Sequence, residues 1–183
     1  MADTTQTTSS AKFAIPYGIT FGAIMFMEFI IMQVLQPDPE KNGWIGVVIN
    51  LLNFLVLPVT LILIACNTYK KNIGKGYIRM SDCIKCGVAL CAMAGLVYAV
   101  GYFIYYIIAP EFIDETIQQI KIITIKKNPK TTSKELEMMS SVLAKTMLPY
   151  IAGPITIVMY SFIGLIESAI IGAVVKKENP GAF

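Results

Sequence analysis

The sequence predicts an all-α integral membrane protein that crosses the bilayer four times. Of its 183 residues, 55% are hydrophobic and 15% are charged, whereas an ordinary soluble domain has about 25% charged residues. A bilayer core about 30 Å thick requires about 20 consecutive apolar residues in a helix. Four such runs occur, at about 13–35, 44–66, 83–108 and 150–175. No linker or change of composition separates them, so residues 1–183 are expected to form a single domain.

The first two spans are expected to be joined by a short turn. The ten residues before the first span, MADTTQTTSS, are polar and lack the basic start of a cleavable signal, so this span should remain in the protein. Pro37 and Pro39 in QPDPEKNG favour a tight turn, and Trp44 follows where an indole prefers the membrane interface. Gly74 and Gly76 then break the chain before the third span.

The connection at about 110–148 is expected to contain two short amphipathic helices. Ile113, Ile117 and Ile120 recur at helical spacing. After the break at KKNPK, Thr132 and Glu135 have the spacing of a capping box, in which each residue bonds the other's backbone N–H. These helices should cover the bundle or lie among the lipid headgroups, with partner binding as the alternative.

The basic residues predict the orientation. Lys70, Lys71 and Lys75 lie between spans two and three, and Lys176 and Lys177 follow span four. Lysine and arginine concentrate in cytoplasmic loops near span ends, so both termini are expected in the cytoplasm. The 110–148 connection also has six lysines, but it has five acids and only one lysine near a span end.

Two acidic residues within the apolar runs, Glu28 and Glu167, are the main candidate functional residues. An ionisable group in hydrocarbon is costly and normally faces protein or water. At 1.5 Å per residue, Glu28 lies about 6 Å outside the bilayer midplane, and five polar side chains lie within about 9 Å of the midplane on the same side. A buried polar cluster is therefore predicted, consisting of Glu28, Asn50, Asn53, Tyr98, Tyr102 and Tyr160.

Glu167 should lie on the inner side, about 12 Å from Glu28 in depth, so the two acids are not expected to pair. Thr60 and Cys91 share its depth and complete a predicted second acid site. Small residues on the first and fourth spans should allow close helix packing. These predicted packing residues are Gly18, Gly22, Gly164, Ser168 and Gly172.

Several segments resemble one family of four-span membrane proteins of Bacteroidota, the domain of unknown function 4199 family. The resemblance lies in KFAIPYGITFGAI, YKKNIGKGYIRMSDCIKCGVAL, YYIIAPEFID and IIGAVVKK, in this order. It implies a multi-pass protein of the bacterial inner membrane with no assigned activity. It also implies an association with envelope enzymes that act on lipid-linked glycans.

Most enzyme classes find no support in the sequence. There is no histidine, which removes the commonest general base and metal ligand. No phosphate-binding loop or dinucleotide motif is present, and no basic, aromatic-rich patch suggests nucleic-acid binding. Cys83 and Cys86 form a CxxC near Cys66, but structural zinc needs four ligands and buried cysteine is common. No catalytic residue, metal or cofactor is therefore predicted.

Two functions remain as expectations. The first is a non-enzymatic accessory or scaffolding subunit of an envelope enzyme, with the lipid bilayer and that enzyme as partners. The alternative is a small proton-coupled transporter or channel, which would require a homodimer or larger homo-oligomer because four spans leave little room for a solvated path.

Overall fold

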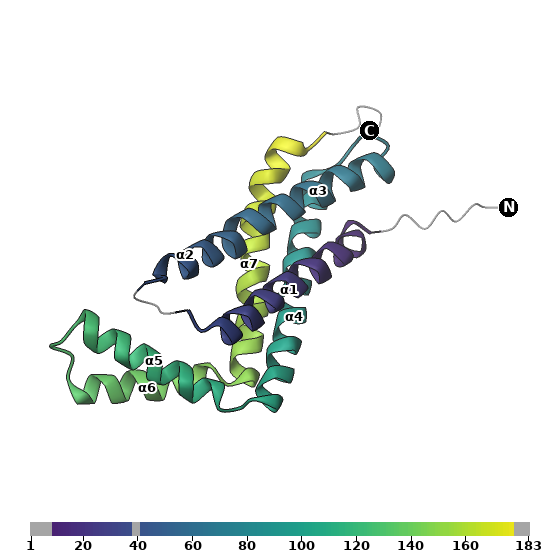
Figure 1. Ribbon diagram of the computed structural model, residues 1–183. Coiled ribbons are helices and arrows are strands. Elements are labelled where there is room, and N and C mark those ends of the chain that lie inside the picture. The colour runs from purple at the N-terminus through teal and green to yellow at the C-terminus, as the bar shows by residue number, and fades with distance from the viewer. Residues whose placement is uncertain (1–8, 38–40, 178–183) are drawn as a thin grey trace.

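The computed structural model describes residues 9–37 and 41–177, and every regular element in these ranges is a helix. Four helices are long and apolar enough to cross a membrane, and two shorter ones connect the third span to the fourth. The predicted fold class is therefore confirmed. The elements are α1 (Ser10–Leu35), α2 (Gly43–Leu51), η1 (Leu52–Val56), α3 (Leu57–Asn72), α4 (Met80–Ile108), α5 (Phe112–Lys127), α6 (Ser133–Thr146) and α7 (Pro149–Val175) (Figure 1).

The second span is one continuous helix made of α2, η1 and α3. Its middle turn, η1, is a π-helix. Pro58 explains this local change, because proline has no N–H to bond the carbonyl four residues earlier and its ring crowds that carbonyl. The predicted turn before this span, at Pro37 and Pro39, falls partly on residues 38–40, outside the described ranges.

One end of the bundle brings together the start of α1, the loop at 73–79 and the end of α7. Ile78 and Lys177 exchange two backbone hydrogen bonds of 3.0 Å. Lys70 Nζ donates to the carbonyl of Val175 at 2.8 Å, an acceptor that the end of α7 leaves free. The Ser10 hydroxyl donates to Asp82 at 3.2 Å. The basic residues used to predict the orientation therefore gather at this end, opposite the α5–α6 hairpin (Figure 1).

Glycines allow α1 and α7 to approach α4 closely. A Cβ added to Gly22 would lie 2.6 Å from the carbonyl oxygen of Ala94, and one added to Gly164 would lie 2.5 Å from that of Gly87. Such contacts are how transmembrane helices pack without a hydrophobic driving force between them. The core formed around α4 includes the fully buried side chains of Phe21 and Leu90.

The first half of the second span stands away from this core. α3 packs against α1, α4 and α7, and Ile62, Ala65 and Cys66 on it are fully buried. In α2, by contrast, none of the nine residues is buried. Trp44 is 64% exposed and Val47 68% exposed.

The α5–α6 hairpin extends sideways from the ends of α4 and α7 (Figure 1). Phe112, Ile113 and Ile117 at its base are buried in a cluster with Tyr102, whereas Ile122 on the distal part of α5 is 53% exposed. The base of the hairpin therefore covers the end of the bundle, as predicted, whereas its distal part does not.

The predicted capping box of α6 is confirmed. The Glu135 N–H donates to the Thr132 hydroxyl at 3.3 Å, and the Thr132 N–H donates to the Glu135 carboxyl at 2.7 Å. This backbone hydrogen bond, with a weaker contribution from the Thr132 hydroxyl, lowers the pKa of Glu135 below its usual value.

Candidate functional site

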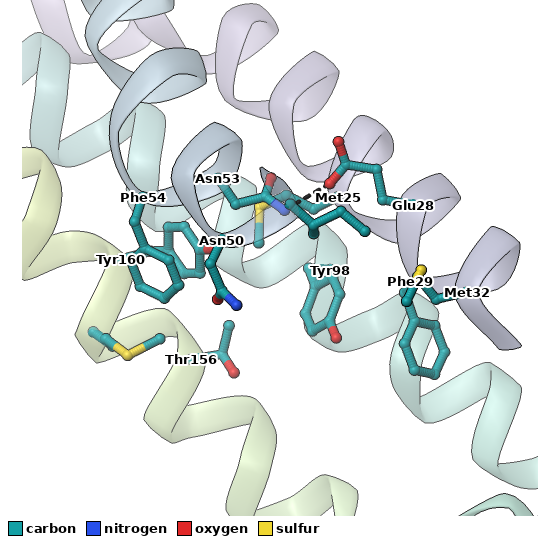
Figure 2. Close-up of a pocket in the computed structure, with 12 residues that line it drawn as sticks. Met25, Glu28, Phe29, Met32, Asn50, Asn53, Phe54, Tyr98, Thr156 and Tyr160 are labelled. Carbon is teal, nitrogen blue, oxygen red and sulfur yellow. Dashed lines mark hydrogen bonds between the residues drawn. The ribbon is translucent and has the colours of Figure 1, made fainter. Parts of the chain in front are cut away.

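A cavity of about 310 Å³ lies among all four spans, next to Glu28 (Figure 2). α1 contributes a carboxyl group, α2 and η1 contribute two amides, and α4 and α7 contribute hydroxyl groups. Apolar side chains complete the wall. The lining residues are Met25, Glu28, Phe29, Met32, Ile49, Asn50, Asn53, Phe54, Tyr98, Thr156, Met159 and Tyr160.

The π turn supplies two of these residues, Asn53 and Phe54. Asn53 is only 8% exposed, and its Nδ2 donates to Glu28 Oε2 at 2.6 Å (Figure 2). This hydrogen bond joins the first span to the second where the second is irregular. π turns within α-helices are often found at functional sites.

Two other polar side chains of the wall donate to carbonyl oxygens of their own helices. Asn50 Nδ2 donates to the carbonyl of Gly46 at 2.8 Å, and the Thr156 hydroxyl donates to the carbonyl of Ala152 at 2.8 Å. Asn53 Oδ1 is buried and has no hydrogen-bond partner in the described part of the chain. At least one acceptor oxygen of the wall, Asn53 Oδ1, is therefore unused.

Aromatic rings form much of the remaining wall. Phe54 stacks on Tyr160 with ring centres 5.6 Å apart and an interplanar angle of 18°. Phe29 meets Tyr98 edge to face at 6.1 Å. The Tyr98 ring also borders a second cavity of about 140 Å³ nearer the hairpin.

The structure brings five of the six residues of the predicted polar cluster to this cavity: Glu28, Asn50, Asn53, Tyr98 and Tyr160. Tyr102 lies elsewhere. Its hydroxyl donates to the carbonyl of Met147 at 2.7 Å, and its ring packs edge to face on Phe112 at 5.5 Å. One helical turn beyond Tyr98, Tyr102 reaches the base of the hairpin instead of Glu28.

The predicted second acid site is only partly assembled. Glu167 is 8% exposed, and Cys91 is fully buried. Both lie where α4 packs against α7, near Gly164, whose added Cβ would lie 3.0 Å from Cys91 Sγ. Thr60, by contrast, is on the exposed surface of α3. Its inclusion was wrong, because equal depth does not imply the same side of the helix.

Glu167 Oε2 is buried without a hydrogen-bond partner in the described part of the chain. Glu167 lines neither the cavity beside Glu28 nor the smaller cavity near the hairpin. Its carboxyl group lies where α4 packs against α7.

The predicted packing residues lie at two helix interfaces. Gly18 and Gly22 face α4 from α1, while Gly164, Ser168 and Gly172 face it from α7. Sequence reasoning missed their partners on α4. Gly87 contacts Ser168 and the backbone of Gly164, and Gly95 approaches the backbone of Ile157.

The four cysteines are buried and form no disulfide bond. Cys86 Sγ donates to the carbonyl of Ser10 at 3.2 Å, so the CxxC contributes to the contact between α1 and α4. Across residues 9–37 and 41–177, no group of three or more metal-binding side chains is found.

Sequence reasoning also missed Thr156, Phe29, Phe54 and three methionines as wall residues of the cavity. Pro58 was the available signal for Phe54 on the second span, because a proline within a predicted span marks irregular backbone. The methionines and Phe29 have no such signal, because these residue types are equally common on lipid-facing surfaces.

Comparison with known proteins agrees with this architecture. A family model described as "Protein of unknown function (DUF4199)" matches residues 16–177. No curated protein and no solved structure matches the chain. The matched region includes most of α1, all of the other spans and the α5–α6 hairpin. The chain therefore belongs to the DUF4199 family of membrane-spanning proteins of unknown function.

Proposed function

We propose that this protein is a non-enzymatic accessory or scaffolding subunit of an envelope enzyme in the bacterial inner membrane. The observation that carries the proposal is the exposure of α2, in which no residue is buried although it continues the well-packed α3. Enzymes acting on lipid-linked glycans are the first class of partner to test, on the basis of the family resemblance. Both termini are proposed to be cytoplasmic, at the end where the basic residues gather.

α2 has features that suit a partner helix. Val47, Val48 and Leu51 are 68%, 42% and 52% exposed, and form an apolar face. Asn50 is exposed nearby, and its amide oxygen has no bond to another helix among the described residues. Lipid chains cannot hydrogen-bond an amide, whereas polar groups of a neighbouring helix can.

The α5–α6 hairpin supports the same proposal. It projects beyond α4 and α7 toward the same side of the molecule as α2 (Figure 1). Ile125, Met138 and Val142 on it are 46%, 61% and 55% exposed. A membrane enzyme would then contact α2 inside the bilayer and the α5–α6 hairpin at the bilayer boundary.

Affinity purification from cells that naturally express the protein tests this proposal. The tagged protein is extracted in mild detergent, and co-purifying proteins are identified by mass spectrometry. Val47→Trp adds bulk on the exposed face of α2, and Val158→Trp is the matched control because Val158 on α7 is 69% exposed. The proposal requires an envelope enzyme to co-purify with the parent and the control, and to be lost or reduced with Val47→Trp.

Recovery of the protein alone, or equal recovery of the enzyme with all three forms, contradicts the proposed role of α2.

The cavity favours a second candidate, a small proton-coupled transporter acting as a homo-oligomer. A carboxyl group beside an open cavity of about 310 Å³ is the feature that a proton-coupled carrier requires. Reconstituted protein would then be a homodimer or larger and would move solute in response to a proton gradient. Absence of flux in vesicles containing folded, oligomeric protein contradicts this candidate.

A further inference from the structure

We infer that the cavity beside Glu28 binds a lipophilic organic cation. This assigns a ligand class to the cavity and goes beyond the accessory role. It does not depend on that role, because binding by the isolated protein can be measured whether or not a partner enzyme exists.

The charge of the cavity wall is the first argument. Among the described residues, Glu28 is the only acidic one that lines the cavity, and no described lysine or arginine lines it. One carboxyl oxygen accepts from Asn53 at 2.6 Å. No described residue forms a hydrogen bond with the other. A carboxylate and a cation attract each other strongly in an apolar setting, because little water screens them.

The hydrogen-bonding groups of the cavity wall also favour a positively charged ligand. The Thr156 hydroxyl and one amide hydrogen of Asn50 are bonded to backbone carbonyls. Asn53 Oδ1 is buried without a partner among the described residues, and Asn53 is 8% exposed. The unpaired oxygen of Asn53 lies beside Glu28, and its partial negative charge favours a positively charged ligand.

The apolar part of the wall selects an organic cation over a metal ion. Phe29, Phe54, Tyr98 and Tyr160 line the cavity, and aromatic faces attract cations. Three methionines add polarizable thioethers, which adapt to ligands of irregular shape. A Mg²⁺ or Ca²⁺ ion would instead need about six oxygen ligands, and this wall offers one carboxyl group.

The size and access of the cavity fit a small lipophilic molecule. Its volume of about 310 Å³ is near the lower end of the roughly 300 to 1,000 Å³ typical of small-molecule sites. Asn50, Phe54 and Met159 on its rim are exposed on the surface of the spanning helices. A ligand can therefore enter sideways from the bilayer, where a lipophilic cation concentrates.

Equilibrium dialysis with the full-length protein in nanodiscs of zwitterionic lipid tests the inference. The probe is tetraphenylphosphonium, and tetraphenylborate is the control ligand because it has the same shape and the opposite charge. Empty nanodiscs correct for partition into lipid. Saturable binding of the phosphonium with no saturable binding of the borate is expected.

Three variants locate the site. Glu28→Gln should weaken phosphonium binding roughly ten- to hundredfold, as expected for loss of a charged contact. Glu167→Gln removes the other intramembrane acid, which does not line the cavity, and should leave the affinity within about twofold of the parent. Phe54→Leu removes an aromatic wall on a side chain that is 39% exposed and should weaken binding severalfold.

The inference is overturned if the protein binds neither probe, if it binds both equally, or if Glu28→Gln and Glu167→Gln affect phosphonium binding equally. If Glu28→Gln does not fold, Phe54→Leu and the selectivity of the parent protein for the phosphonium decide the question. Failure of the accessory proposal, seen as absence of a partner in affinity purification, would leave these binding results unchanged.

Discussion

Replacing Glu28 tests the polar contact that joins the first two spans. In the parent protein Asn53 is 8% exposed, donates to Glu28 at 2.6 Å and already has one unpaired oxygen. Glu28→Leu would leave the whole Asn53 amide without a partner. A buried polar group that loses its partner costs about 1 to 3 kcal/mol, so the variant should unfold more easily by that amount.

Glu28→Gln is the matched control. A glutamine oxygen can still accept from Asn53 Nδ2, and its NH₂ can donate to the unpaired Asn53 Oδ1. The change in unfolding free energy should therefore remain below about 1 kcal/mol. Both variants are compared with the parent by reversible denaturation in mixed micelles, with helix content measured by circular dichroism.

A double-mutant cycle makes this test specific for the pair. Glu28→Leu combined with Asn53→Leu removes both polar groups, so the double variant should be destabilised by less than the sum of the single variants. Equal losses for Glu28→Leu and Glu28→Gln, or strict additivity in the cycle, would show that the contact does not stabilise the bundle.

Three further perturbations test other parts of the fold. Gly164→Ala should lower the free energy of unfolding by about 1 to 3 kcal/mol, because the added Cβ would lie 2.5 Å from the Gly87 carbonyl oxygen. In the control Gly46→Ala the added Cβ meets nothing within 4 Å, so this variant should be neutral or stabilising in the same denaturation assay. Ile117→Asp should release the hairpin from the bundle and speed amide hydrogen exchange in α5, because Ile117 is only 5% exposed. The control Ile122→Asp should not, because Ile122 is 53% exposed. Equal exchange rates in the two variants would exclude docking of the hairpin. The stabilisation of the start of α6 by Glu135 is complete at pH values above the usual carboxyl pKa, and it should disappear as the pH falls through the lowered pKa of Glu135. An NMR titration that shows an ordinary pKa for Glu135 would contradict the capping contact.

The relative height of side chains along the bundle could be predicted from the sequence. A helix rises 1.5 Å per residue, so counting from span midpoints assigns a height to every side chain. This is why Glu28, Asn50 and Asn53, chosen by height alone, line the same cavity. The capping box of α6 was predictable for a similar reason, because it depends only on local spacing.

Rotation about each helix axis could not be predicted in the same way. Each span is apolar around most of its circumference, so periodicity does not identify the side that faces protein. Thr60 has the depth of Glu167 but is exposed on α3, and Tyr102 reaches Met147 instead of Glu28. The error for Thr60 arises from using height without rotation, whereas Tyr102 lies one helical turn beyond Tyr98 and therefore at the height of the hairpin base.

The different packing of α2 and α3 also could not be predicted from the sequence. α2 and α3 are both rich in aliphatic residues, yet α3 packs in the bundle and α2 has no buried residue. The difference depends on which helices lie beside each segment, and α3 packs against α1, α4 and α7. The π turn at Leu52–Val56 likewise required Pro58 to be interpreted together with its neighbours.

Photo-crosslinking in intact membranes tests the proposed role of α2 most directly. A photoreactive amino acid replaces Val47 on α2 or, as the control, Val158 on α7, which have nearly equal exposure of 68% and 69%. The proposed accessory function predicts one discrete crosslinked envelope protein from position 47 and only lipid adducts from position 158. Lipid adducts alone from both positions, or a crosslink from position 47 only to a second copy of the chain, would contradict it.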